Sequence, residues 1–336
     1  MSKRQLTRSE RNKIILKIGI AAGVLIIIMV FILVALMPTY TPKTERTSGS
    51  VTPEGIIEVD GVKYVPKKNI ETYLFMGIDN PGKVEKVEDY GGAGRCDYVM
   101  LVVRDLSTGT YKTLNINRNI LMEQDSLEPD GTYIGTSTAI LALAHENGDG
   151  MEISCENVVK TVSNFLGGQK IDGYAAVNMG AITIINNLAG GVTVTIEDDF
   201  SNINPSLVKG ETITLTDEQA YDFVHSRWYV DDETNESRMR RQSAYMADLK
   251  LKLKQKCEEN ANYPVTIYDS LGEYMVTNIT SQKFSKLALL MLKDKDDGEL
   301  NIEGTSEVGD LEYAEMTADE ESVEAAILEL FYRKYE

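Results

Sequence analysis

The sequence predicts an α/β protein, namely a layered α-β-α sandwich around a mixed central sheet, preceded by one N-terminal transmembrane helix. Three observations lead to this prediction. Residues 18–37 form an uncharged, mostly apolar stretch. From residue 72 onward, short apolar runs alternate with stretches whose apolar residues recur at helical spacing. Strands interleaved with helices are typical of a sheet covered by helices on both faces.

The N-terminal segment has the charge pattern of a membrane anchor. Residues 1–17 contain six basic side chains and one acidic one, although the 336-residue chain has a net charge of −18. As a helix, the uncharged stretch 18–37 would span about 30 Å, the thickness of a bilayer core. Cleaved signal peptides have shorter apolar runs and a small-residue cleavage site, which "ALMPTY" does not provide. We therefore expect an uncleaved signal anchor.

The same pattern sets the expected topology. Basic flanks stay on the cytoplasmic side, so we expect residues 1–17 in the cytoplasm of a single-pass plasma-membrane protein. Residues 38–71 are rich in Thr, Ser, Pro and Gly at their start, which is typical of a linker. The Asp-Gly pair 60–61 predicts a short hairpin within it. Residues 72–336 then form the extracytoplasmic domain.

The elements of this domain follow from periodicity and from turn residues. The predicted strands are residues 72–79, 97–105, 111–117, 174–178 and 192–199. The predicted helices are residues 138–146, 156–168, 180–191, 216–228, 237–256 and 322–335. Thr216 and Gln219 have the spacing of a capping box, which predicts a helix start at that point. The acidic part after Cys257 has no motif for chemistry, and we expect helical packing over the sheet there.

Composition excludes two classes of function. A strongly acidic outer domain would repel nucleic acid, so no nucleic-acid partner is expected. Zinc is not expected either, because the chain has two histidines and no metal-type spacing of His and Cys. The three cysteines (Cys96, Cys155, Cys257) are too few for a disulfide framework. At least two of them are expected in the core, whether paired or free.

Arginines are the first group of candidate site residues. Nine follow Met37, and five of these fall at ends of predicted elements that can converge: Arg95, Arg118, Arg227, Arg238 and Arg241. The guanidinium group is a planar, permanently charged fork of donors that suits phosphate. In so acidic a domain, a bound polyanion explains such a cluster. Salt bridges to the surplus Asp and Glu explain it equally well.

Two aspartates form the second group. Asp79 follows one predicted strand and Asp97 begins the next, so both fall where sites form in α/β sheets. Such a pair can hold a magnesium ion that also meets a substrate phosphate. Two solvated carboxylates at loop edges remain the alternative. Asp231, Asp232 and Glu233 are candidate general bases, against the alternative of a solvated acidic loop.

Several ordered motifs resemble the LytR-CpsA-Psr (LCP) domain. They are "YLFMGIDN", "GRCDYVMLVV", "LNINRNIL", "ENVVKTVSNFLGGQKIDGYAAVN", "INNLAGGVTV", "TDEQAYDFVHSR" and "RMRRQ". The resemblance runs from Thr72 to Arg241 and continues more weakly to the C-terminus. The anchor and linker also fit the usual layout of this family.

The resemblance implies a bacterial cell-wall enzyme. Family members move a glycopolymer, such as teichoic acid or capsule, from a polyprenyl diphosphate lipid to peptidoglycan. It implies a Mg²⁺ ion on Asp79 and Asp97, and catalytic roles for Arg95, Arg118 and Asp97. It also implies a group that binds the diphosphate: Arg95, Arg118, His225, Arg227, Arg238 and Arg241. The lipid tail is expected in an apolar tunnel beside the sheet.

Three positions depart from the family pattern. Asn119 stands where an aspartate follows the arginine, His225 where arginine is common, and Cys96 where serine is common. A histidine is only partly protonated near neutral pH, so it holds phosphate less firmly than arginine does. Two hypotheses therefore remain: an active transferase, and a weakened or inactive relative that binds polyprenyl phosphates or wall polymer as a scaffold or attenuator. The sequence does not predict an oligomeric state.

Overall fold

The computed structural model describes residues 56–226, 228–233, 235–291, 294–308 and 314–335. A six-stranded sheet lies at its centre, with the strand order β11-β8-β3-β4-β5-β12. Its strands are β3 (Ile70–Ile78), β4 (Cys96–Asp105), β5 (Thr110–Ile116), β8 (Gly173–Asn178), β11 (Met275–Thr277) and β12 (Lys295–Asn301). Strand β3 pairs antiparallel with β4 and parallel with β8, and β5 pairs parallel with β12. The predicted α/β class with a mixed central sheet is confirmed.

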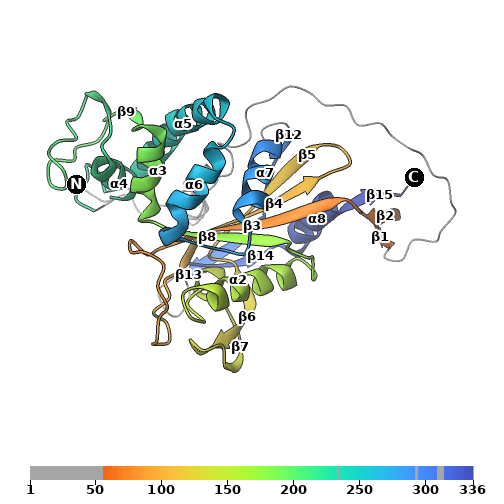
Figure 1. Ribbon diagram of the computed structural model, residues 1–336. Helices are drawn as coiled ribbons and strands as arrows, with labels where there is room; N and C mark the ends of the chain where they lie inside the picture. The colour runs from red at the N-terminus through yellow and green to blue at the C-terminus, as the bar shows by residue number, and fades with distance from the viewer. Residues whose placement is uncertain (1–55, 227, 234, 292–293, 309–313, 336) are drawn as a thin grey trace, which may run out of the picture.

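Helices pack against both faces of this sheet (Figure 1). One face packs against α3 (Ala181–Ala189), α4 (Asp217–His225), α5 (Asn235–Glu259), α6 (Tyr263–Leu271) and α7 (Ser281–Met291). The other face packs against α2 (Glu152–Phe165) and α8 (Glu320–Phe331). The alternation along β3 causes this division, because Tyr73 and Phe75 join the first core while Leu74 and Met76 join the second. The near-continuous apolar run of β3 is therefore buried on both sides.

Local signals in the sequence account for several boundaries. Helix α4 begins with the predicted capping box, in which Thr216 Oγ1 accepts from Gln219 N and Gln219 Oε1 accepts from Thr216 N. Helix α2 ends at the predicted glycines, where Gly168 N donates to Ser163 O. The Asp-Gly hairpin is also present, joining β1 (Ile57–Val59) to β2 (Val62–Pro66).

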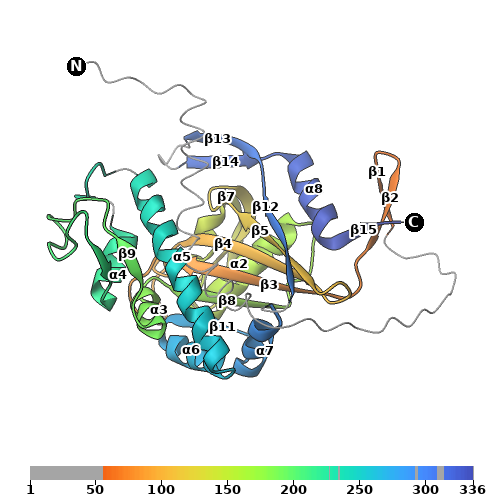
Figure 2. The same ribbon diagram turned by 90° about the horizontal axis from the view of Figure 1, so that it is seen from above.

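Four small sheets surround the central one. The hairpin β1–β2 is extended by β15 (Tyr332–Lys334), which pairs with β2 beyond α8 (Figure 2). The other pairs are β6 (Leu121–Leu127) with β7 (Tyr133–Ile140), β9 (Thr193–Thr195) with β10 (Thr212–Thr214), and β13 (Gly304–Val308) with β14 (Ala314–Ala318). The hairpin assigned to the linker thus packs with the C-terminal strand of the domain.

Two expectations about secondary structure are wrong. Residues 138–146 were expected to be helical, but β7 continues to Ile140 and only the 3₁₀ turn η1 (Leu141–Ala144) follows. The backbone N–H groups of Leu141 and Ala142 donate to Ile120 and Arg118 across the fold, which replaces helical hydrogen bonds. The C-terminal part is also not purely helical, since it contributes β12, β13, β14 and β15.

The expected membrane helix, residues 18–37, lies outside the described residues. Within the described ranges, no helix is both long enough and apolar enough to cross a bilayer.

A substitution at Gly180, which precedes α3, would show how tightly this position packs against the loop after β3. A Cβ on Gly180 would lie 2.4 Å from Pro81 O and 2.5 Å from Tyr274 Cε1. We expect Gly180→Ala to lower the free energy of unfolding by about 1–3 kcal/mol, measured by chemical denaturation. Gly272→Ala is the matched control, because a Cβ there meets nothing within 4 Å and φ is −51°. Equal stability of the two variants would contradict the packing.

Candidate functional site

The pairing of β3 with β4 creates one corner of the site. The register shifts between Gly77 and Ile78, so that Ile78 pairs with Cys96. Asp79 N then donates to Arg95 O at 2.9 Å, which places Asp79 beside the start of β4. Gly94 allows this approach, because it has φ +78° and a Cβ there would lie 3.2 Å from Cγ2 of Ile78. The glycine-rich loop before β4 therefore serves to bring the two aspartates together.

Asp97 is a carboxylate of this corner whose pKa is shifted. Burial raises its pKa, the neighbouring Asp79 raises it further, and the ion pair with Arg118 opposes both; the net pKa is raised. Arg118 follows β5, which runs antiparallel to β4, and its Nη1 donates to Asp97 Oδ1. The predicted convergence of Asp79, Asp97 and Arg118 is thus present in the structure.

Arg95 is held by a residue that the sequence analysis did not find. Its Nε donates to Glu146 Oε1 at 2.9 Å, and both side chains are partly buried. Glu146 follows η1, in the segment that was expected to be helical. No local pattern marks an ion pair between positions 51 residues apart, so only the fold could show it.

His225 forms the opposite wall. It is the last residue of α4 and stacks on Tyr221, with ring centroids 5.1 Å apart. Burial lowers its pKa, Asp79 acts to raise it, and Arg238 acts to lower it further; the net pKa lies below the ordinary value of 6.5. His225 is therefore mainly neutral at pH 7, and it can donate a hydrogen bond without adding full charge.

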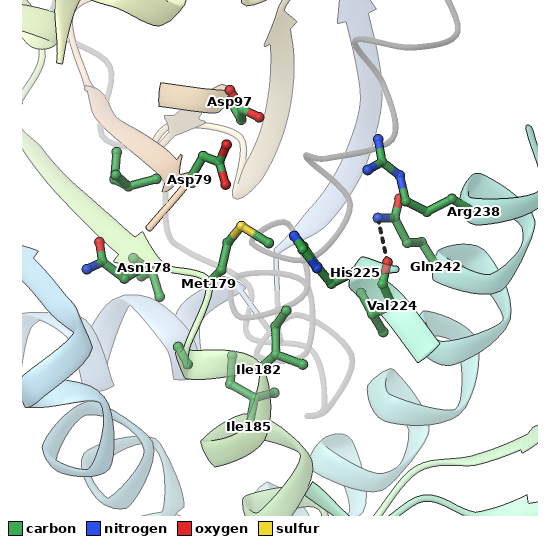
Figure 3. Close-up of a pocket in the computed structure, with 14 residues that line it drawn as sticks. Asp79, Asp97, Asn178, Met179, Ile182, Ile185, Val224, His225, Arg238 and Gln242 are labelled. Carbon is green, nitrogen blue, oxygen red and sulfur yellow. Dashed lines mark hydrogen bonds between the residues drawn. The ribbon is translucent and has the colours of Figure 1, made fainter. Parts of the chain in front are cut away.

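The arginines of α5 divide into two kinds. Arg238 points into the same space as His225 (Figure 3), and Gln242, one turn further, donates to Val224 O at 3.2 Å. Arg241 is 3% exposed and pairs with the buried Asp198. Its guanidinium also donates to the carbonyl oxygens of Phe223 and Ser226. Arg241 thus fastens α5 to the end of α4 and does not line the pocket.

These walls enclose a pocket with a cavity volume of about 150 Å³. Its polar end carries Asp79, Asp97, His225 and Arg238. The remaining lining is mostly apolar (Figure 3). It comes from β8, α3 and the segment between them, from the ends of β3 and α4, and from α5: Gly77, Ile78, Val177, Asn178, Met179, Ala181, Ile182, Ile185, Val224 and Gln242. The pocket therefore joins a charged end to an apolar one.

The predicted residues outside this lining lie at different places. Arg118 does not line the pocket itself but forms an ion pair with Asp97, which does. Arg95 lies in the loop that leads into β4. Arg227 lies outside the described residues. Asp231, Asp232 and Glu233 are exposed in the loop between α4 and α5, where Lys209 Nζ lies 2.9 Å from Asp231 Oδ2.

Asn178 and Met179 are lining residues that sequence reasoning missed. Asn178 is the last residue of β8 and Met179 follows it; β8 is parallel to β3, so both strands end at the same edge of the sheet. Asn178 Nδ2 donates to Gly82 O at 2.9 Å and Met179 N donates to Asn80 O at 2.9 Å, which ties the loop after β3 to this edge. The rule that sites lie beyond the carboxyl ends of parallel strands would have identified both.

A metal site here would rest on two carboxylates. Among the residues that the structure describes, no group of three or more His, Cys, Asp or Glu side chains is placed to hold a metal ion. All three cysteines are buried and free, as expected of core residues.

Comparison with known proteins adds independent information. The chain matches the family model LytR_cpsA_psr over residues 39–326. A search of curated proteins finds no match. Solved structures of similar fold include TagV of B. subtilis, which is 24% identical with a TM-score of 0.53 and covers 79% of this chain and 96% of its own. They also include a Streptococcus agalactiae protein, 20% identical with a TM-score of 0.57, covering 78% of this chain and 86% of its own.

A third structure of similar fold is described as TagT bound to LI-WTA. It is 20% identical with a TM-score of 0.51, and the match covers 78% of this chain and 90% of that one. These likenesses establish the fold. The family match covers most of the chain, from the expected linker to α8. The chain therefore belongs to the LytR_cpsA_psr family.

Proposed function

We propose that this protein transfers a glycopolymer from a polyprenyl diphosphate carrier to peptidoglycan by Mg²⁺-assisted phosphoryl transfer. Members of the LytR_cpsA_psr family are wall glycopolymer transferases, and the chain belongs to that family. The pocket is the observation that carries the proposal, because its charged end and apolar lining suit a ligand with an anionic head and a hydrocarbon tail. A teichoic acid, a capsule polymer or a related glycan would be the cargo.

A Mg²⁺ ion fits the two aspartates. Mg²⁺ is usually held by one or two carboxylates, with waters and substrate phosphates as its other ligands. Asp79 and Asp97 line the same pocket, and the pKa of Asp97 is raised first by burial and further by the charge of Asp79, which a bound cation would offset. When bound, the ion would neutralise negative charge on the diphosphate. Asp79 and Asp97 would hold it at the polar end of the pocket.

The remaining charged residues would hold the diphosphate. In phosphoryl transfer the protein mainly positions groups and neutralises charge on oxygen atoms. Arg118 and Arg95 would act from the β4 side and Arg238 from the α5 side, with His225 as a weaker donor between them. Arg227, adjacent to this wall in sequence, is assigned the same role. Arg241 would act indirectly, because its hydrogen bonds fix the end of α4 that carries His225.

The proposed reaction breaks one bond and forms one. A hydroxyl group of the wall sugar attacks the phosphorus on the glycan side of the diphosphate, and the phosphoanhydride bond breaks. The glycan is then joined to the wall sugar by a phosphodiester, polyprenyl phosphate leaves, and the hydroxyl proton passes to a base. Asp231, Asp232 and Glu233 are the candidate bases, because they are exposed in the loop between His225 and Arg238.

The proposed location follows the same logic. Residues 1–17 would lie in the cytoplasm, residues 18–37 would cross the plasma membrane, and the α/β domain would lie outside. An anchor confines the domain to the surface that holds the lipid carrier, which raises the effective concentration of both. The linker before β1 would let the pocket reach the carrier.

The second candidate is a weakened or inactive relative of the transferases, and the properties of His225 favour it. Its lowered pKa leaves this position mostly uncharged at pH 7, where relatives are expected to carry arginine. Asn119 is buried, and its N–H donates to Asn117 Oδ1 within the turn that carries Arg118. A protein so altered would bind polyprenyl phosphates or wall polymer as a scaffold.

Arg118 provides the direct test of the transferase proposal. We expect Arg118→Ala in the full-length chain to lower release of polyprenyl monophosphate from a polyprenyl diphosphate sugar by roughly 10²–10³-fold, because charge on the leaving phosphate is no longer neutralised. Mass spectrometry with and without Mg²⁺ measures the product. Arg333→Ala is the control, since Arg333 is exposed on β15. Equal release by Arg118→Ala and the unaltered chain contradicts the proposal.

The pH dependence of substrate binding tests the role of His225. Its pKa is lowered, so the ring gains charge only as pH falls through a value below 6.5, and affinity for the diphosphate should rise over that range. His225→Arg should bind more tightly at pH 7 and lose this pH dependence, whereas His225→Gln should lose it without gaining affinity. Titrations between pH 5 and pH 8 measure both. An unchanged profile in His225→Gln would mean that another group titrates.

Asn119→Asp separates the two candidate functions. If the unaltered chain is a competent transferase, the added carboxylate changes turnover little, because Arg118 is already held by Asp97. This is the result that we expect from the release assay. An increase of roughly tenfold or more would identify a damaged site and favour the attenuated relative.

A further inference from the structure

The loop between α4 and α5 exposes two large aromatic side chains. Trp228 is 60% exposed and Tyr229 is 67% exposed, although aromatic residues of this size are usually largely buried. Trp228 is also the single tryptophan of the chain. Both residues follow directly after the segment that carries His225. The loop thus presents an apolar surface next to a charged pocket.

Hydrogen bonds and burial fix this loop on both sides of the aromatic pair. Before it, Ser226 O accepts from the buried Arg241. After it, Val230 is 1% exposed and belongs to the core beneath α4, and Asp231 N donates to Asp199 O at 3.1 Å. Glu233 Oε1 accepts from Tyr229 N at 3.0 Å. The two rings are therefore displayed by a braced segment.

The backbone of the loop is strained. Tyr229, Asp231 and Glu233 have φ values of +63°, +41° and +54°, a region that costs L-residues about 1–2 kcal/mol each. Such conformations persist where the surroundings impose them, and they gather at functional sites. Here the strained residues alternate along a segment whose one buried side chain, Val230, fixes its path.

The position of the loop relates it to the pocket. Its two ends carry His225 and Arg238, and both of these line the pocket. Three residues of chain span at most about 11 Å, so Trp228 lies within that reach of His225. The aromatic pair therefore lies near the His225 side of the pocket, outside the residues that line it.

We propose that Trp228 and Tyr229 form the subsite for the acceptor, where their rings stack on uncharged pyranose rings of a wall glycan strand. This inference rests on the proposed transferase function and adds the place where the acceptor binds. Trp and Tyr supply large, rigid contact area at low entropic cost, with a polar tip that can hydrogen-bond to hydroxyl groups. In the proposed transferase the donor phosphates would lie in the pocket, so an acceptor bound to the aromatic pair would have its hydroxyl group near them.

Neighbouring charge favours a neutral sugar over a membrane surface. Asp231, Asp232 and Glu233 follow the aromatic pair and are exposed. Anionic lipid headgroups would be repelled by these carboxylates, whereas surface-binding segments typically place basic residues beside their aromatic ones. Carboxylate oxygens accept hydrogen bonds from sugar hydroxyl groups, and each has more than one acceptor site.

The single tryptophan makes the test direct, because intrinsic tryptophan fluorescence of the full-length chain reports on position 228 alone. We expect a saturable change in this fluorescence on titration with a tetramer of β-1,4-linked N-acetylglucosamine, and none with phosphatidylglycerol vesicles. Tyr229→Ala should raise the Kd by roughly two- to tenfold, the effect of losing one aromatic contact. Calorimetry should show the same for Trp228→Ala and a smaller effect for Trp228→Phe.

Tyr133→Ala is the matched control. Tyr133 is 60% exposed on β7, which lies apart from α4 in both views (Figures 1 and 2), so its removal should leave the Kd unchanged. No fluorescence change with the tetramer, a response to vesicles alone, or an equal loss in Tyr133→Ala and Tyr229→Ala would each overturn the subsite.

The failure of this inference can be told from failure of the proposed function. Polyprenyl monophosphate release without tetramer binding would reject the subsite and leave the transferase intact. Tetramer binding without donor cleavage would support glycan binding by the aromatic pair and reject the transferase.

Discussion

The site depends on the antiparallel pairing of β3 with β4 and on the register shift at its end. Without that shift, Asp79 would not meet the backbone of Arg95, and the two aspartates would not share a corner of the sheet. The central position of both strands fixes this geometry, because each has a hydrogen-bonded neighbour on either side and side chains buried on both faces. Charged residues at the ends of such strands inherit the rigidity of the core.

Ion pairs account for three of the candidate arginines of this acidic domain, and phosphate binding is the role proposed for those near the pocket. Arg95, Arg118 and Arg241 each pair with a carboxylate, on Glu146, Asp97 and Asp198 respectively. Arg241 is so buried that its pair serves the fold, whereas the other two pairs are partly open to solvent. An anion arriving at Arg118 would compete with Asp97, unless a cation took over that carboxylate. The proposed metal and the proposed arginine are therefore coupled through one side chain.

Much of the fold could be predicted where the signal is local. The capping box of Thr216 and Gln219, the Asp-Gly turn and the apolar run of β3 each act within a few residues. The helix predicted for residues 138–146 was wrong because a short apolar run fits a buried helix and the end of a strand equally well. Hydrogen bonds to residues distant in sequence decide between the two. Strand β12 was not predicted, because its exposed, acidic sequence has no apolar alternation. Its parallel pairing with β5 makes it a strand.

The site shows the same division. Asp79, Asp97, His225 and Arg238 could be placed because they stand at the ends of regular elements. Glu146 and the inward turn of Arg241 could not, since both depend on partners that are distant in sequence. Side-chain direction near the end of a helix is set by tertiary packing, which periodicity alone does not specify.

The strands from the C-terminal part have a consequence for how the protein is made. Strand β12 pairs with β5 and β15 pairs with β2, so an edge of each sheet is completed by a segment that lies far along the chain. Lys295 pairs with Thr110 and Lys334 pairs with Tyr64. During synthesis, one edge of β5 and one edge of β2 therefore stay unpaired until β12 and β15 have been made. Folding of such a chain is completed only after its last segments have been made, and factors that shield exposed sheet edges would act in the interval.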